Sequence, residues 1–228
     1  MKIPTKSSHF LRLKQNMAHL IPLNRSNAQL KSLLIVGLPR GFTSQSYRIA
    51  RKATGLKQAF MSAGEILNYQ RHEEYPAYWM LREPAAMLSF KKFAFWCASD
   101  QAYEAIRASL DQIPSRGFVF KDVCFPQLVH RYISQNPDRF NVVFIRRDPR
   151  KVAVSIKTKG WKYPAETQEL IREIYSNYPF IDADKAIFDH HHIPDILHRE
   201  FGYRIRYSNY ISPHFKRTRD LIEQKYEK

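Results

Sequence analysis

Residues 33–44 read LLIVGLPRGFTS, an apolar run that breaks into a loop of Gly, Pro, Arg and hydroxyl residues. Helix-like sequence follows, so the stretch predicts a strand that leads through a loop to the N-terminus of a helix. Backbone N–H groups at such a terminus lack partners, and the helix dipole favours negative charge there. The stretch therefore predicts a phosphate-binding loop near Arg40 that requires no metal.

Short apolar runs elsewhere in the chain extend this strand into a sheet. Five runs have the length and composition of strands: 32–37, 58–62, 117–121, 141–146 and 203–207. Helix-length segments separate them, which favours parallel pairing through right-handed crossovers. We therefore expect an α/β fold with a central parallel sheet flanked by helices on both faces, and a ligand at the C-terminal ends of the strands.

The length of 228 residues and the hydrophobic content of 44% suffice for one domain with a sizeable core. We expect residues 1–30 to form a basic N-terminal arm and residues 31–228 to form a single α/β domain. No apolar run approaches the roughly 20 residues of a membrane-spanning helix, so no membrane span is expected. Cys97 and Cys124 indicate neither a disulfide framework nor a zinc cluster. These features favour a cytoplasmic protein, with organelle targeting by the basic N-terminus as the alternative.

The formal net charge of +16 is concentrated in the first part of the chain. Residues 1–64 carry 11 Lys or Arg and no acidic residue, whereas the remainder carries 26 basic and 21 acidic residues. A positive field attracts anionic ligands, which include nucleotides, nucleic acids and acidic substrates. Nucleic acid is the least favoured of these, because the sequence contains no recognised nucleic-acid-binding module.

A second string with phosphate-binding character lies at 142–155 and reads VVFIRRDPRKVAVS. Its pattern predicts a strand, a turn and the start of a helix, with Asp148 as the N-cap and Pro149 as the first helical residue. Arg147 at the end of the strand is followed eight positions later by Ser155. A guanidinium group can make a bidentate charged contact with a phosphate, and a hydroxyl can donate one more hydrogen bond.

Together the two strings resemble the nucleotide-binding motifs of PAPS-dependent sulfotransferases. The 5′-phosphosulfate loop of that family, P-[KR]-S-G-T-[TS], is matched at four positions: Pro39, Arg40, Thr43 and Ser44. Gly41 and Phe42 replace the Ser and Gly of the motif. The family's 3′-phosphate motif has an Arg and a Ser at the spacing of Arg147 and Ser155. The resemblance extends through most of residues 30–225, although only these two motifs are specific.

This resemblance implies a P-loop NTPase-like sulfotransferase fold and transfer of a sulfuryl group from PAPS, with PAP as product and no metal. The acceptor would be a hydroxyl or amine of a small molecule, carbohydrate or peptide, and an acidic acceptor is compatible with the charge. Six residues would bind the 5′ end: Pro39, Arg40, Gly41, Phe42, Thr43 and Ser44. Arg147 and Ser155 would bind the 3′-phosphate, and Arg40 would also stabilise charge on the leaving phosphate.

The resemblance also implies catalytic residues. FVFKDV at 118–123 is similar to the family's middle strand, and Lys121 occupies the position of its functional lysine, but Asp122 and Val123 stand where Thr and a His base are common. AFMSAGEILNY at 59–69 is similar to members that place a catalytic Glu after the second strand, which makes Glu65 the proposed base. Asp122 is the second candidate. The alternative role for Glu65 is helix capping, because Ser62 precedes it at capping-box spacing.

Other interpretations of the sequence remain open. A noncatalytic PAP- or polyanion-binding protein of the same fold is the alternative function, given Phe42, the missing His and the large positive charge. A P-loop kinase is disfavoured because G-x-x-x-x-G-K-[ST] counted from Gly37 would need Gly at position 42 and Lys at position 43. The acidic and histidine run at 189–192 lacks the i, i+4 spacing of helical metal ligands, so no metal is expected.

Overall fold

The sheet is built around strand β1 (Ser32–Gly37), all of whose residues are buried. The computed structural model describes residues 27–38, 40–59, 99–122, 125–158, 165–189 and 191–206. β1 lies between β3 (Phe118–Asp122) and β4 (Phe140–Arg146), while β2 (Lys57–Gln58) and β5 (Phe180–Asp182) extend the sheet. The strand order is β2-β3-β1-β4-β5, and every neighbouring pair is parallel. The predicted α/β fold with a central parallel sheet is therefore confirmed.

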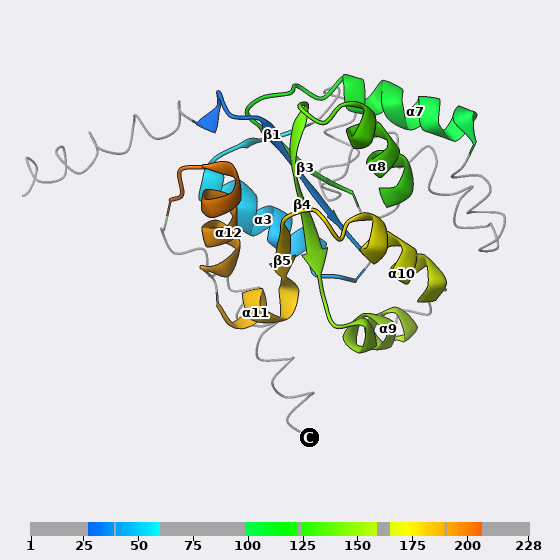
Figure 1. Cartoon of the computed structure of the whole chain (residues 1–228). Helices are drawn as coiled ribbons and strands as arrows, with labels where there is room; N and C mark the ends of the chain where they lie inside the picture. Colours follow the sequence, from blue (N-terminus) through cyan, green and yellow to red (C-terminus); the bar gives the residue numbers. More distant parts are fainter. Residues whose placement is uncertain are drawn as a thin grey trace, which may run out of the picture.

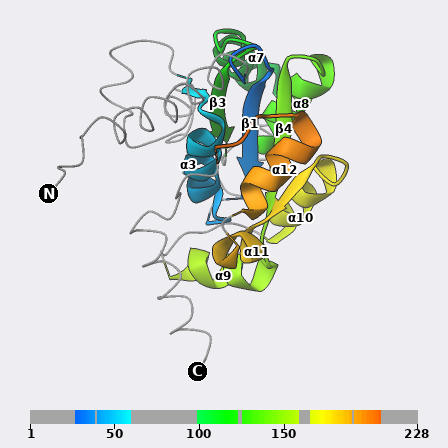
Figure 2. The ribbon, with the colours of Figure 1, turned by 90° about the vertical axis from the view of Figure 1, so that its left-hand side faces the viewer.

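Helices cover both faces of this sheet (Figure 1). One face carries α3 (Thr43–Thr54) and α12 (His192–Phe201), and the other carries α7 (Asp100–Asp111), α8 (Pro126–Gln135) and α10 (Ala165–Ile174). The two remaining labelled helices, α9 (Pro149–Lys157) and α11 (Ala183–Phe188), lie beyond the C-terminal ends of the strands (Figure 2). The C-terminal edge of the sheet is therefore bordered by α9, α11 and the start of α3.

The hydrophobic core has two layers because side chains alternate along β1. Leu34 and Val36 pack with the helices α7, α8 and α10, whereas Leu33 and Ile35 pack with α3 and α12. Both layers are apolar next to this strand, as a parallel strand covered on two faces requires. This is the physical reason why residues 33–36 form a continuous apolar run.

The prediction of a strand at 203–207 is wrong for the part that the structure describes. Residues 203–206 form no strand, and the fifth strand is β5, which pairs with β4. The backbone N–H of Arg204 donates to Asn27 Oδ1 at 2.9 Å, and that of Arg206 donates to Ala53 O at 2.9 Å. These backbone groups therefore bind a side chain and the end of α3 instead of a neighbouring strand.

The other predicted strands lie within a residue of the observed ones where both are described. β2 is shorter than the predicted strand at 58–62, and residues 60–62 lie outside the described residues. Also outside them are residues 1–26 of the predicted arm, Pro39, Glu65, Cys97 and Cys124. Asn27 is 2% exposed and Leu30 packs against the α3 layer, so the end of the predicted arm contacts the fold. Within the described ranges, no helix combines the length and apolar character that crossing a membrane requires.

Candidate functional site

The two strings that the sequence singles out meet at the C-terminal edge of the sheet. Gly37 at the end of β1 is paired in register with Ile145 of β4, so the segments that follow both strands leave the sheet at the same level. Arg147 Nη1 donates a hydrogen bond to Arg40 O at 2.7 Å, and Arg40 Nε donates to Ser155 Oγ at 3.0 Å. The structure thus brings together three of the predicted nucleotide-binding residues, which we name the Arg40–Arg147–Ser155 cluster.

The loop before α3 has an unusual backbone conformation. Arg40 and Phe42 have φ angles of 65° and 74°, and they are the non-glycine residues with positive φ among those described. An L-residue in this region costs about 1–2 kcal/mol, and such residues are common at ligand-binding sites. Between them, the Gly41 N–H donates to Leu38 O at 2.9 Å and closes a turn. The Phe42 side chain packs against the α3 layer of the core.

The N-terminus of α3 has the properties of an anion site. Phe42 is its N-cap and supplies no side-chain hydrogen bond, and the first turn contains no acidic residue. Thr43 is buried, with Oγ1 at 3.5 Å from Leu38 O, whereas Ser44 is exposed. A helix end with neither an acidic residue nor a capping side chain presents its positive dipole to an incoming ligand.

Lys121 and Asp122 end strand β3 on opposite faces of the sheet. Lys121 is 3% exposed and lies in register with Ile35, on the face that carries α3. Asp122 is fully buried on the α8 face, and its Oδ1 accepts a hydrogen bond from the Phe125 N–H at 3.3 Å, next to the start of α8. Burial raises the pKa of Tyr175, and the charge of Asp122 contributes to that rise. Asp122, the second candidate for the base, therefore also has structural contacts.

Helix α9 begins as its sequence predicts. Asp148 is the N-cap, its Oδ1 accepts a hydrogen bond from the Arg150 N–H at 2.8 Å, and Pro149 occupies the first turn. The Asp148 N–H in turn donates to Asp184 Oδ2 at 3.0 Å. Lys151 Nζ lies 2.9 Å from Asp184 Oδ1. The Asp184 carboxylate thus binds the start of α9, which lies between Arg147 and Ser155, to α11.

Asp184 is the residue at this site that the sequence analysis missed. It follows the short strand β5 in the string FIDAD, where Asp182 N-caps α11 and accepts from the Asp184 N–H at 2.9 Å. Burial raises the pKa of the Asp184 carboxyl, but the Asp148 N–H, the Lys151 ammonium and the charge of Arg147 outweigh burial and lower it. The signal available in the sequence was an aspartate at a helix N-cap, Asp182, with Asp184 in the first turn, and this pattern indicates only the start of a helix.

The lowered pKa of Asp184 predicts a pH-dependent contribution to stability. The contribution is present above the unfolded pKa of about 4 and is lost as the pH falls through the lower folded pKa. We expect Asp184→Asn to lower the free energy of unfolding by about 1–2 kcal/mol at neutral pH, and this difference to shrink below pH of about 4. Urea denaturation of both proteins across this range measures it. A difference that stays constant into acid would contradict the prediction.

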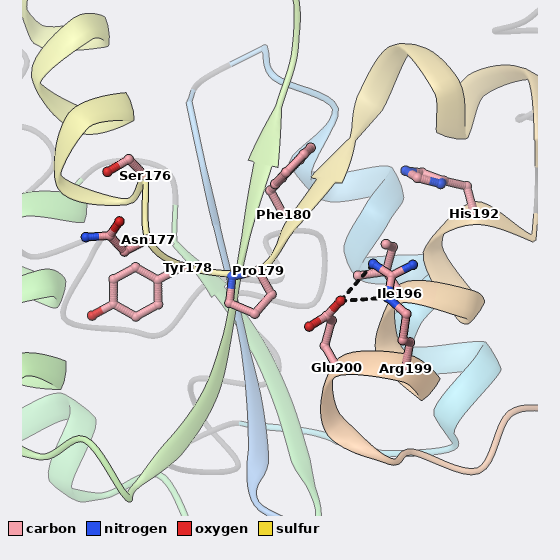
Figure 3. A pocket seen from close by; sticks show the side chains of 9 residues that line it. All are labelled: Ser176, Asn177, Tyr178, Pro179, Phe180, His192, Ile196, Arg199 and Glu200. Atoms are coloured by element: carbon pink, nitrogen blue, oxygen red, sulfur yellow. Dashed lines mark hydrogen bonds and ion pairs between the residues drawn. The ribbon is translucent and has the colours of Figure 1, made fainter.

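A separate hollow lies at the β5 edge of the sheet (Figure 3). It is lined by residues 176–180, from the turn after α10 to the start of β5, and by four residues of α12: His192, Ile196, Arg199 and Glu200. The figure also shows the ion pair between Arg199 and Glu200, in which Arg199 Nη2 lies 2.7 Å from Glu200 Oε1. None of the predicted site residues lines this hollow.

The cluster supplies an anion with several hydrogen-bond donors. Arg40 is exposed, and Arg147 is half-buried with an Nε that has no hydrogen-bond partner among the described residues. Ser155 Oγ accepts from Arg40, and its own O–H can rotate to donate to another group. A phosphate would accept hydrogen bonds from the exposed Arg40, from the Ser155 hydroxyl and from the adjacent helix terminus together. No protein-family model matches the chain, and no curated protein matches it.

Proposed function

We propose that the chain is a PAPS-dependent sulfotransferase with a P-loop-like sulfotransferase fold. The observation that carries the proposal is the contact of Arg40 with both Arg147 and Ser155 at the C-terminal ends of β1 and β4. A nucleotide with phosphate groups at two positions can use cationic donors from two segments, and Arg40 and Arg147 belong to the two segments that resemble the family's motifs. The order of the strands around β1 supports a ligand there, because ligands of open α/β sheets bind at the C-terminal edge.

In this proposal the Arg40–Arg147–Ser155 cluster divides its donors between the two ends of the nucleotide. Arg147 supplies its guanidinium, and Ser155, whose Oγ accepts from Arg40, supplies its hydroxyl hydrogen; together they bind the 3′-phosphate. Arg40 uses Nε for Ser155, so its terminal nitrogens bind the 5′ end together with the N-terminus of α3. Preorganised donors of this kind act most strongly on charge that develops during the reaction.

PAPS supplies the sulfuryl group: the acceptor oxygen bonds to sulfur while the bond between sulfur and the phosphate oxygen breaks, and PAP leaves. Arg40 stabilises the negative charge that collects on that phosphate oxygen. The acceptor proton passes to a carboxylate, for which Glu65 is proposed and Asp122 is the second candidate. Lys121 adds positive charge at the end of β3. The acceptor group is a hydroxyl or an amine. The molecule that carries it is a small molecule, a carbohydrate or a peptide.

Titration calorimetry with PAP and with AMP, which lacks the 3′-phosphate, tests the nucleotide site. We expect the chain to prefer PAP, and Arg147→Ala to weaken PAP binding by about 10–100-fold through loss of a charged bidentate donor. AMP binding should change much less. Arg107→Ala is the matched control, because Arg107 on α7 is half-exposed and forms an ion pair with Glu104 at 2.5 Å.

The same proteins distinguish the sulfotransferase from the noncatalytic alternative. Two products of labelled PAPS report transfer: labelled sulfate when water is the acceptor, and labelled para-nitrophenyl sulfate when para-nitrophenol is the acceptor. PAP binding without any release would support a PAP-binding protein. Absence of PAP preference in the unmodified chain would overturn the proposed nucleotide site altogether.

The conformation of the loop gives a further prediction at Gly41. A Cβ at this position would lie 2.8 Å from Leu38 O, the atom that accepts the Gly41 N–H. Gly41→Ala should therefore shift the turn, lower the free energy of unfolding by about 1–3 kcal/mol and weaken PAP binding. Gly202→Ala is the control: φ is 70° there, but a Cβ meets nothing within 4 Å. Equal PAP affinity in the two variants would contradict the assigned role of the loop.

A further inference from the structure

Helix α9 carries Ser155 but has little apolar contact of its own with the fold. It contains nine residues, and the buried ones are Val152 and Ile156. Val154 on the same helix is 42% exposed. A helix of this length is marginal without tertiary contacts. The orientation of Ser155 toward Arg40 therefore depends on other interactions that hold α9 in place.

Asp184 supplies such interactions from α11. Its two carboxylate oxygens bind different points of the first turn of α9: Oδ2 accepts from the Asp148 N–H at 3.0 Å and Oδ1 accepts from Lys151 Nζ at 2.9 Å. Figure 2 shows that both helices lie at the same end of the molecule. Both interactions involve a charged group, and such hydrogen bonds are stronger than neutral ones.

Asp184 is itself held firmly in place. Its N–H donates to Asp182 Oδ1 at 2.9 Å, and the same oxygen accepts from the Lys185 N–H at 3.0 Å, so Asp182 fixes the first turn of α11. Ala183 between them is fully buried, and Asp182 pairs in register with Arg146 at the end of β4. The carboxylate that binds α9 is therefore fixed relative to the same strand that leads into Arg147.

The face of α9 that Asp184 binds is the face that presents Ser155. Residues spaced by three, four and seven positions lie on one side of a helix, so Asp148, Lys151 and Ser155 share a face with the buried Val152. Moving the first turn of α9 would therefore move Ser155 relative to Arg40. It would also move Arg147, because Asp148 follows it directly.

We propose that Asp184 is a positioning residue that holds Arg147 and Ser155 in the geometry that selects nucleotides with a 3′-phosphate. This inference rests on the proposed function, because it takes the cluster to be a nucleotide site. Asp184 does not touch the nucleotide. It acts through Asp148 and Lys151, so its loss should affect the 3′-phosphate end most and should reach the 5′ end mainly through the contacts of Arg40 with Arg147 and Ser155.

Asp184→Asn in the full chain tests this inference, with PAP and AMP as the probes. We expect PAP affinity to fall about tenfold, AMP affinity to change less than about twofold, and the preference for PAP to fall accordingly. Asp138→Asn is the matched control, because Asp138 also accepts a hydrogen bond from a lysine at 2.9 Å. Its side chain is 97% exposed, and it lies just before β4, at the N-terminal end of the strand and away from the cluster. It should leave both affinities unchanged.

Lys151→Gln is a second variant that keeps Asp184 and its bond to the Asp148 N–H. It should lower the preference for PAP in the same direction and by less, and the double variant should show less than the sum of the two effects. Backbone hydrogen exchange of residues 150–158 without ligand measures the attachment of α9 directly, and Asp184→Asn should make this exchange faster.

The outcomes separate the two hypotheses. An unmodified chain that binds PAP no better than AMP overturns the proposed function, and the inference with it. An unmodified chain that prefers PAP, with Asp184→Asn folded and its preference unchanged, overturns the inference alone. If Asp184→Asn does not fold, an unchanged preference in Lys151→Gln also overturns it. Lower affinity for both nucleotides by equal factors would mean a general structural role, and this too counts against selective positioning.

Discussion

Arg40→Ala is expected to reduce the rate of sulfate release from labelled PAPS by about 100- to 1,000-fold, the range found when one donor to a developing oxyanion is removed. PAP affinity should fall less, by about tenfold, because Arg147, Ser155 and the N-terminus of α3 remain. The reason for this difference is that charge grows on the phosphate oxygen only as the bond to sulfur breaks. Single-turnover release and calorimetry with PAP measure the two effects separately.

Arg40→Lys separates the charge of Arg40 from its geometry. Lysine keeps the positive charge but has no Nε to bind Ser155 as the guanidinium does at 3.0 Å. We expect Arg40→Lys to be faster than Arg40→Ala in sulfate release, but not to orient Ser155 as the guanidinium does. Equal losses of rate and of PAP affinity in Arg40→Ala would show that Arg40 contributes only binding. An unchanged rate would remove Arg40 from the proposed chemistry.

The sequence predicted the two halves of the candidate site because both follow long buried strands. β1 contains the apolar run 33–36 and β4 contains the apolar run 142–145, so the loops after them stand out in the sequence. Parallel pairing brings the C-terminal ends of the two strands to one edge of the sheet. The hydrogen bonds of Arg40 with Ser155 and Arg147 are consistent with that rule. The sequence pattern did not identify the segment that binds α9.

Asp184 could not be predicted because its partners are distant in the sequence and its own strand is short. β5 has three residues, its first residue Phe180 is 42% exposed, and Ser, Asn, Tyr and Pro precede it. These residues predict a turn, so no strand and no nearby site was expected there. A local pattern contains no information about a carboxylate that binds a backbone N–H 36 residues away.

The strand predicted at 203–207 is wrong because the local pattern there is strand-like although residues 203–206 form no strand. YRIRY alternates aromatic or aliphatic residues with arginine, which is the pattern of a half-buried strand. Tyr203 is indeed fully buried, but its hydroxyl donates to Lys31 O, and Asn141 Nδ2 donates to that hydroxyl at 3.1 Å. The alternation thus reflects an extended segment lying against the core, whose backbone partners come from Asn27 and α3.

Asn27→Ala is therefore expected to cause a large loss of stability. The Asn27 side chain is 2% exposed and joins three segments: Nδ2 donates to Thr54 O and to Arg204 O, both at 2.7 Å, and Oδ1 accepts from the Arg204 N–H at 2.9 Å. Truncation leaves these backbone groups without that partner, and we expect the free energy of unfolding to fall by about 2–4 kcal/mol.

Asn136→Ala is the matched control, because the Asn136 side chain makes one described hydrogen bond, from Nδ2 to Tyr132 O at 3.0 Å, at the end of α8. It should cost about 1 kcal/mol. Chemical denaturation compares the two variants, and hydrogen exchange at Arg204 and Arg206 shows whether the segment has loosened. Because Asn27 ties that segment to the end of α3, faster exchange there should accompany the lost stability. Equal costs for the two variants would mean that apolar burial of Tyr203, and not the Asn27 hydrogen bonds, holds the segment against the sheet.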